Sequence, residues 1–513
     1  MATTYAAKAE VSRPGPPSRT DVGSRLQRPM PTDRLWGWLG PLAIALVAAY
    51  LRFNRLSKPR ALVFDEVYYS KDSYDLLRYG VERGPKGTGP GFVVHPPLGK
   101  WLIAPGQAIF GHNTLGWRFA AALFGSMAVL ILARTARRLT RSTLLGCLAG
   151  LLLALDGLAF VQSRVAMLDI FLMFWVLAAF ACLVTDRDAG RARLAARLAA
   201  GMSPDRLRVG LRWWRLGAGA CLGAACATKW SAIYYVAAFG LLAFGWDVGA
   251  RRTAGAAEPF RSALRADLVP SGLALLVLPA LVYVVSWTGW FLGDAATAWD
   301  HDRYVRAGQG TVTHARAVFG GWLHYHWEAW RFHIHLSTKH PYQSSPWGWL
   351  LLARPVLYFA TYPKLGELGC SATAGCARVT LDIGTPAIWW ASIPATVTMA
   401  WRWISRRDWR AAAVLAGMGA GLLPWLATPE RTMFFFYALP ALPFMILGLT
   451  LCAGLALGSP DADPRRRLPG AVAVGAYALL VIVNFFYLYP VLAAKVIPYV
   501  DLQARMWFGS WWL

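Results

Sequence analysis

The sequence predicts an all-α integral membrane protein with about eleven transmembrane helices. Of its 513 residues, 56% are hydrophobic and only 15% are charged, whereas soluble domains are about 25% charged. The hydrophobic residues fall in blocks of about 17–25, the length of helix that spans a hydrocarbon core of roughly 30 Å. Arginines gather in the short loops between these blocks. A soluble fold is excluded, because a soluble chain of this length would need polar surface that is missing here.

Eleven hydrophobic blocks are candidate spans. They lie near residues 36–53, 117–135, 143–161, 166–184, 213–229, 231–247, 268–290, 383–400, 411–427, 433–457 and 470–489. Residues 1–34 are rich in Pro, Ser and Arg and have neither the apolar core nor the cleavage site of a signal peptide. We expect them to form a disordered cytoplasmic tail, and residues 35–513 to form one polytopic membrane domain.

The net charge of +25 would suit a nucleic-acid-binding protein, but its distribution indicates a membrane topology instead. Cytoplasmic loops carry an excess of Lys and Arg. Eleven spans with the N-terminus inside place all five arginine-rich loops in the cytoplasm. These loops are Arg134–Arg141, Arg187–Arg215, Arg251–Arg265, Arg402–Arg410 and Arg465–Arg467. We therefore expect a multi-pass protein of the cell membrane, with no nucleic-acid partner.

This topology leaves residues 54–116, 162–166, 291–382 and 428–432 outside. In 54–116, apolar residues recur at helical spacing from Phe64 to about Tyr79, and a second apolar stretch ends at Phe110. The second stretch is too short to span and is expected to lie at the interface. Segment 291–382 is crowded with Trp, Tyr and His, and we expect it to lie on the bilayer surface.

Cys370 and Cys376 flank a stretch of small residues in this second outer segment. A disulfide between them would close a short loop in an oxidising compartment. The other five cysteines lie in apolar blocks and are expected to be small core residues.

Two adjacent acids, Asp65 and Glu66, follow the first span. One interpretation is structural, with Asp65 as a helix N-cap and Phe64 and Tyr69 as a hydrophobic staple. The other makes Asp65 a general base and Glu66 an orienting acid. The two interpretations are compatible.

Several further charges fall at the outer ends of spans, where charged groups are costly and often mark function. Each alone could reach the headgroups. Together with the acid pair, cations on one face suit a phosphate-bearing ligand. These charged residues are Lys100, Arg164, Asp169, Lys229, Glu430 and Arg431. The histidine pairs at 324/326 and 333/335 do not share a helix face, so neither a metal nor another cofactor is expected.

Six short segments, in this order and topology, resemble protein O-mannosyltransferases, and the chain is similar to the actinobacterial members. The resemblance extends over nearly all of residues 35–513. The segments are Phe64-Asp65-Glu66, His95-Pro96-Pro97-Leu98-Gly99-Lys100, Ser163-Arg164 through Leu168-Asp169, Thr228-Lys229-Trp230, His340-Pro341-Tyr342-Gln343-Ser344-Ser345-Pro346-Trp347 and Arg431-Thr432-Met433-Phe434.

The resemblance implies a GT-C membrane fold with interfacial helices on its outer face. It implies inverting transfer of mannose from polyprenyl phosphate mannose to Ser or Thr hydroxyls of secreted proteins outside the cytosol. Membrane lipid and the secretion channel are candidate partners. Relatives from eukaryotes carry a β-trefoil domain in a large lumenal loop; segment 291–382 has no strand periodicity, so that domain is not expected.

The resemblance also implies roles for individual residues. Asp65 would be the base and Glu66 would belong to the same acidic pair. Four cations would hold the donor phosphate: Arg164, Lys229, Lys100 and Arg431. Five residues would meet the acceptor or shape the site: His95, Asp169, His340, Tyr342 and Trp347.

Chemistry agrees with a transferase, since a departing phosphate needs no strong general acid, whereas glycoside hydrolysis normally uses two carboxyl groups. Two alternatives remain open. One is a GT-C transferase with a lipid or glycan acceptor, such as an arabinan, against which the segment from His340 to Trp347 argues. The other is a transporter, which would place its polar groups near the bilayer midplane.

Overall fold

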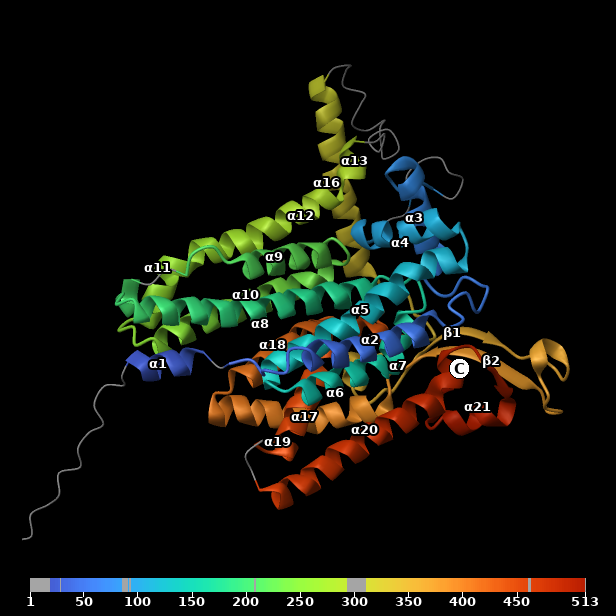
Figure 1. Ribbon diagram of the computed structural model, residues 1–513. Helices are drawn as coiled ribbons and strands as arrows, with labels where there is room; N and C mark the ends of the chain where they lie inside the picture. Colours follow the sequence, from blue (N-terminus) through green and yellow to red (C-terminus); the bar gives the residue numbers. More distant parts are fainter. Residues whose placement is uncertain are drawn as a thin grey trace, which may run out of the picture.

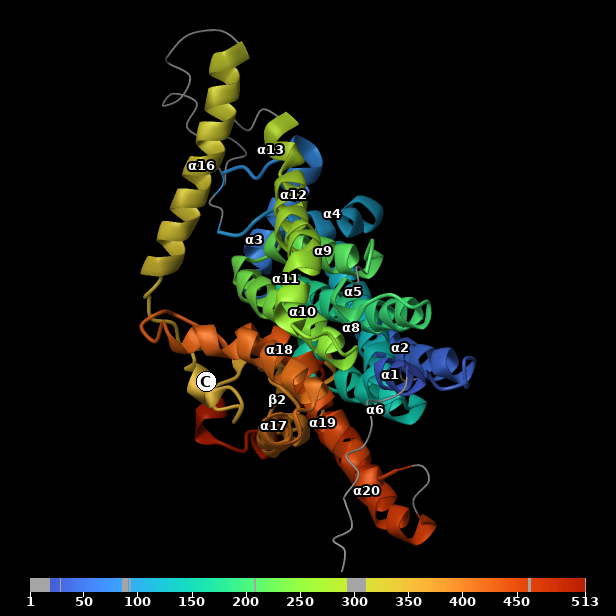
Figure 2. The same cartoon turned by 90° about the vertical axis from the view of Figure 1, so that its left-hand side faces the viewer.

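A computed structural model describes residues 19–27, 29–84, 91, 94–206, 209–292, 311–459 and 463–512. It is largely helical, with long helices packed side by side (Figures 1 and 2). The expected tail residues 1–18, and most of the glycine- and proline-rich loop between the two outer helices, lie outside the described residues.

The first half of the bundle surrounds α8, which packs on α5 and α9, while α5 packs on α2, α4 and α6. Its helices are α1 (Arg19–Leu26), α2 (Trp36–Phe53), α3 (Glu66–Tyr79), α4 (Leu98–Phe110), α5 (Thr114–Thr140), α6 (Thr143–Ala154), α7 (Gly157–Gln162), α8 (Asp169–Ala199), α9 (Trp213–Cys226) and α10 (Ile233–Thr253). The helix over 64–79 and the one ending at Phe110 were both predicted.

The second half begins with α11 (Pro259–Gly272), which continues through a π-helical turn into α12. The remaining helices are α12 (Leu278–Ser286), α13 (Thr288–Leu292), α16 (Thr311–His335), α17 (Pro386–Arg406), α18 (Trp409–Leu426), η6 (Phe435–Ala441), α19 (Leu442–Leu457), α20 (Pro464–Leu492) and α21 (Tyr499–Arg505). Aromatic contacts of Phe444 on α19 with Phe180 on α8 and Phe239 on α10 join the two halves. Helix α16 runs across the direction of α8 (Figure 1).

Each of the eleven expected spans falls on a helix, but the count of eleven is not confirmed. Among the described residues, seven helices are long and apolar enough to cross a membrane. The other four expected spans coincide with α6–α7, α9, α17 and α18, which lie outside that set. The block at 143–161 is broken because Asp156 caps α7 through the Ala159 N–H, and α9 has only 14 residues.

The tail is not entirely irregular, because α1 packs against α8. Leu26 is buried there, and the Gln27 side chain donates a hydrogen bond to the Ala192 carbonyl over 3.1 Å. The Arg191 guanidinium donates to the Leu26 carbonyl. The expectation of disorder therefore fails for 19–26, because the arginine-rich end of α8 provides a docking surface.

The outer segment contains strands that its sequence did not predict. Strands β1 (Val356–Thr361), β2 (Cys376–Asp382) and β3 (Val496–Pro498) form an antiparallel sheet in the order β1-β2-β3. Six of the seven positions of β2 are buried, so it lacks the alternation that reveals a strand. The partner strand β3 comes from the far C-terminal end of the chain.

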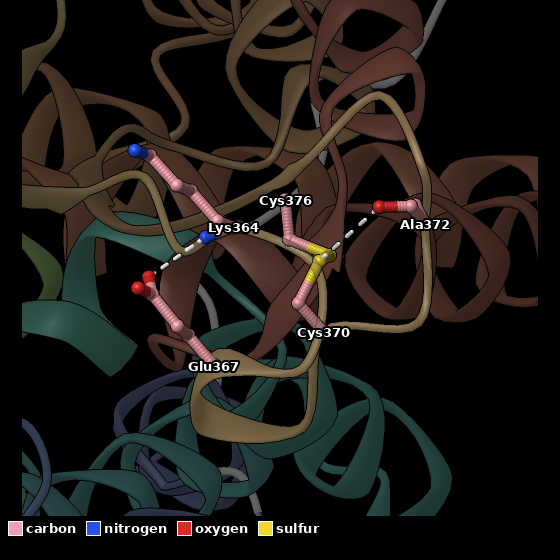
Figure 3. The surroundings of a disulfide bond; sticks show 5 residues. All are labelled: Lys364, Glu367, Cys370, Ala372 and Cys376. Atoms are coloured by element: carbon pink, nitrogen blue, oxygen red, sulfur yellow. Dashed lines mark hydrogen bonds between the residues drawn. A yellow bond between two sulfur atoms is a disulfide. The ribbon is translucent and has the colours of Figure 1, made fainter.

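The disulfide that the sequence suggested is present: Cys370, in the loop between β1 and β2, is bonded to Cys376, the first residue of β2 (Figure 3). The same loop is braced by the Glu367 carboxylate, which accepts the Lys364 N–H over 2.9 Å.

A buried ionic network joins α8, α9 and α10. Arg212 and Arg215 donate to Asp186 on α8 and to Asp247 on α10, at distances of 2.6–3.1 Å. All four side chains are at most 7% exposed. Removing one member of a buried network leaves the opposite charge desolvated and uncompensated.

We expect Asp186→Asn to lower the free energy of unfolding by about 3–5 kcal/mol, measured by denaturant titration in detergent. The matched control is Glu258→Gln, which breaks the exposed Arg261–Glu258 pair and should cost less than about 1 kcal/mol. Equal, small effects in both variants would contradict a stabilising role for the network.

Candidate active site

Asp65 lies at the start of α3, at a sharp turn of the chain. The preceding residue, Phe64, has a left-handed backbone with φ of 48°, which costs of order 1–3 kcal/mol for a residue with a side chain. In the described chain the Asp65 carboxylate makes no capping hydrogen bond. The structure thus does not support the capping interpretation. The nearest polar partner is the Tyr69 hydroxyl, which donates to Asp65 Oδ2 over 3.5 Å.

The carboxyl group of Asp65 is suited to accept a proton near neutral pH. Burial raises its pKa to about 6, Lys229 opposes this shift, and Asp169 adds to it. A general base works best when its pKa lies near the operating pH.

Glu66, in contrast, is fully buried and saturated with hydrogen bonds. Arg118 donates from Nε to Oε1 and from Nη2 to Oε2, both over 2.7 Å. The backbone N–H groups of Val63 and Ala166 donate to the same carboxylate. Glu66 therefore joins α3, α5 and the turn before α8, and it acts as a scaffold beside Asp65. Sequence analysis missed Arg118, whose signal was a lone arginine inside an apolar block.

Two of the four cations expected at the donor phosphate are bound elsewhere. The Arg164 guanidinium donates to the carbonyls of Leu51, Arg52, Asn54 and Arg55, which seals the C-terminal end of α2. The carbonyls of Leu51 and Arg52 belong to the last turn of α2, where carbonyls lack a partner within the helix, and those of Asn54 and Arg55 follow directly, so a guanidinium satisfies this end well.

Lys100 is equally committed, because its ammonium pairs with Asp72 and Glu82, each over 3.0 Å. A large cavity is lined by Asp169 and Lys229, the two charged residues that act on the Asp65 carboxyl. As far as the described residues define it, its lining includes neither Lys100 nor Arg164, and Asp65 itself lies just behind this lining. Both cations are therefore paired within the protein, and their expected contact with a phosphate stays a prediction.

The other two cations line this cavity, which has a volume of about 790 Å³. Its walls come from the start of α8, the α9–α10 junction, the end of α16 and the turn after α18. The lining includes Asp169, Leu172, Lys229, Ile233, Tyr234, Trp330, His333, Ile334, Trp425, Glu430, Arg431, Tyr437 and His95. Lys229 is paired with Asp169, whose two carboxylate oxygens lie 2.9 and 2.8 Å from Nζ.

Arg431 is held at the cavity with part of its guanidinium unused. Nε donates to the His333 carbonyl and Nη2 to His333 Nδ1, both over 3.1 Å. Nη1 is buried and has no hydrogen-bond partner within the described chain. A buried, unsatisfied cationic donor is costly. An anionic ligand in the cavity would satisfy it.

His333 fixes the orientation of Arg431. Its Nε2 lies 2.8 Å from the Val94 carbonyl, so Nε2 carries the proton and Nδ1 accepts. Burial lowers the pKa of His333 to about 4, and Arg431 and Lys229 add to this effect. The imidazole is therefore neutral at pH 7.

His95 lies between the acidic and the cationic parts of the site. Its ring centroid is 6.3 Å from that of Tyr69 and 5.2 Å from that of His333. Burial, with the nearby charge of Lys229, holds its pKa well below the usual range. Nδ1 is buried without a partner in the described chain. A neutral His95 can therefore exchange a hydrogen bond with a ligand hydroxyl.

The segment from His340 to Trp347 reaches the site only at its beginning. The His340 ring lies 5.8 Å from that of Phe64, and Tyr342 donates its N–H to His340 Nδ1 over 3.1 Å. Trp347 is 77% exposed. The structure thus brings His340 next to the Asp65 turn, with Tyr342 hydrogen-bonded to His340, and leaves Trp347 at the surface.

Comparison with known families matches two adjoining parts of the chain. Residues 42–285 match the family described as dolichyl-phosphate-mannose-protein mannosyltransferase. Residues 318–511 match the C-terminal four TMM region of protein-O-mannosyltransferase.

Relatives and solved structures agree with this match. The chain is 42% identical over 495 residues to polyprenol-phosphate-mannose–protein mannosyltransferase from Mycobacterium tuberculosis, covering 94% of this chain and 93% of the relative. Identity to the protein of that name from Corynebacterium glutamicum is 36%, covering 94% and 96%. The fold resembles the S. cerevisiae Pmt1-Pmt2 O-mannosyltransferase complex bound to the sugar donor, with a TM-score of 0.72 at 14% identity, covering 96% and 94%.

The expected family, the mainly helical GT-C membrane fold and glycosyltransferase activity are thereby confirmed. The chain belongs to the dolichyl-phosphate-mannose-protein mannosyltransferase family.

Proposed function

We propose that this enzyme transfers mannose from polyprenyl phosphate mannose to Ser or Thr hydroxyls of secreted proteins, with Asp65 as the base. One observation carries the proposal. The Asp65 carboxylate, whose pKa is raised to about 6, lies within electrostatic range of Asp169 and Lys229, and these two residues line a cavity that also presents an unsatisfied N–H of Arg431. The names of the relatives from Mycobacterium tuberculosis and Corynebacterium glutamicum support this donor and a protein acceptor.

The reaction is a single displacement at the anomeric carbon. The acceptor oxygen attacks that carbon from the side opposite the phosphate, and its proton passes to the Asp65 carboxylate. The bond from the anomeric carbon to the phosphate oxygen breaks, and its electron pair leaves with polyprenyl phosphate. The configuration inverts, and no second carboxylic acid is needed, because phosphate is a good leaving group.

Arg431 and Lys229 hold the leaving phosphate as its negative charge grows. Lys229 is partly neutralised by Asp169, which leaves Arg431 as the more strongly attracting group. Charge-assisted hydrogen bonds in a site shielded from water favour the developing anion. The apolar side chains among the cavity walls, such as Ile233 and Trp425, suit the isoprenoid chain of the donor.

We place the site on the extracytoplasmic face. The arginine-rich end of α8 lies beside α1, whereas α3, which follows Asp65, and the sheet lie at the opposite end of the bundle (Figure 1). The positive-inside bias favours a cytoplasmic location for the arginine-rich end. The Cys370–Cys376 disulfide at the other end suits an oxidising compartment.

The base is tested by Asp65→Asn. We expect transfer to a Ser/Thr peptide to slow at least about a hundredfold, because Asn cannot take the hydroxyl proton. Donor binding should persist. The matched control is Asp463→Asn at the N-cap of α20, where Asn caps as well as Asp. A folded Asp65→Asn enzyme that transfers mannose at the wild-type rate would rule out Asp65 as the general base.

The pH profile tests the same group independently. Because the folded pKa of Asp65 is raised to about 6, the base is protonated and inactive below that pH. We expect kcat/KM to rise through about pH 6 and to fall about tenfold per pH unit below it. His333, with a pKa of about 4, does not titrate in this window. A profile that is flat from pH 5 to 8 would contradict the assignment.

The phosphate contact is tested by Arg431→Gln. Hydrogen bonds to charged groups contribute roughly 1.5–3 kcal/mol, so kcat/KM for the donor should fall about tenfold to a hundredfold. Arg331→Gln is the control, because Arg331 is exposed on α16 and pairs only loosely with Glu328. Arg164→Ala should instead destabilise the fold, since it releases four carbonyls. Unchanged donor kinetics in Arg431→Gln would refute the phosphate role.

A further inference from the structure

Phe64, the residue before Asp65, has a disfavoured backbone conformation, and its side chain is surrounded by other aromatic rings. Its φ of 48° lies in the left-handed region, which residues with a Cβ rarely adopt. Its ring is in contact with four others. The centroid distances are 5.8 Å to His340, 5.2 Å to Tyr358, 5.2 Å to Phe434 and 5.6 Å to Phe436. We call these four residues the aromatic box.

The members of the aromatic box come from three separate segments. His340 follows α16, Tyr358 lies on β1, and Phe434 and Phe436 lie at the start of η6. The box is thus built only when the outer segment, the sheet and the second half of the bundle meet at the Asp65 turn.

The box is itself firmly held. The Gln162 amide donates to the Tyr358 hydroxyl over 2.7 Å and to Asp382 over 2.8 Å. Phe434 and Phe436 stack with an interplanar angle of 4°. Ser344 donates its N–H to the Met433 carbonyl, which ties the loop of His340 to the strand-like stretch before η6. The Phe64 ring, which packs against these four fixed side chains, therefore has little freedom to move.

Within the described part of the chain, the Asp65 carboxylate has no comparable support, because its hydrogen bond is the 3.5 Å contact from the Tyr69 hydroxyl. Its position follows from its two chain neighbours. Glu66 is fixed by Arg118 on one side, and Phe64 is fixed by the box on the other. The chain enters α3 through the left-handed residue Phe64, and the Asp65 side chain makes no capping hydrogen bond there.

We propose that Phe64 is a positioning residue: its seat in the aromatic box holds the left-handed turn that aims Asp65 at the acceptor hydroxyl. This inference rests on the proposed function. A displacement of about 1 Å at a reacting group can cost a hundredfold in rate. Loosening the ring should therefore affect the chemical step and not donor binding, since the ring is not part of the described cavity lining.

The test measures donor KM and kcat for mannosyl transfer to a Ser/Thr peptide by Phe64→Leu, Phe434→Leu and the double variant. We expect kcat to fall at least about tenfold in Phe64→Leu, with donor KM within about twofold of wild type. The double variant should be no slower than Phe64→Leu alone, because both changes remove the same ring contact. Multiplicative losses, or an unchanged kcat in folded Phe64→Leu, would overturn the inference.

Phe239→Leu is the matched control. Phe239 is fully buried among aromatic rings in the bundle core, so its loss should lower stability without changing kcat of the folded enzyme. If Phe64→Leu does not fold, kcat is measured for Phe434→Leu and Phe436→Leu instead. Each of these variants removes one ring that contacts Phe64 and leaves the left-handed residue itself unchanged. If neither slows kcat, the inference fails. Absence of transfer by the wild-type enzyme would instead refute the proposed function.

Discussion

The ion pair of Glu66 with Arg118 is the constraint on which the site depends. Both groups are buried, and the carboxylate also accepts two backbone N–H groups, so its oxygens are well satisfied. Breaking such a pair leaves one buried charge unpaired, at a cost of about 3–5 kcal/mol. The pair fixes the start of α3 to α5 and to the turn before α8. It therefore determines where the neighbouring carboxylate of Asp65 can lie.

Two adjacent acids lie in different surroundings, and the proposed function gives them different tasks for that reason. Glu66 meets a guanidinium and two backbone N–H donors, which hold it in place and leave little capacity to accept hydrogen bonds from a ligand. Asp65 meets one weak hydroxyl contact, and burial raises its pKa to about 6. Different environments can give two neighbouring carboxylates different roles, and the proposed role of Asp65 as the base follows from this difference. The aromatic box around Phe64 completes the same arrangement from the other side of Asp65.

The four cations near the site also differ in their surroundings: two are paired within the protein, and two line the cavity. Arg164 satisfies the free carbonyls at the end of α2, and Lys100 neutralises Asp72 and Glu82. Desolvated charges must find partners, and these two have found theirs within the protein. Arg431 keeps one buried N–H group without a partner in the described chain, and Lys229 shares the cavity with it. A site for an anion arises where the protein itself leaves cationic donors incompletely paired.

The sequence by itself determined the membrane class, the positions of the helices, the helix after Asp65 and the family, and it suggested the disulfide that the structure contains. Hydrophobic blocks, local periodicity and short motifs are properties of neighbouring residues, so they can be read along the chain. The tertiary structure alone decided which charges are free. Arg164 and Arg431 look alike in sequence, and only the carbonyls of residues 51–55 and the ring of His333 distinguish them. The sheet was missed for the same reason, because β2 is buried along most of its length and pairs with a strand near the C-terminus. Partners distant in the chain set these roles, and no local pattern encodes them.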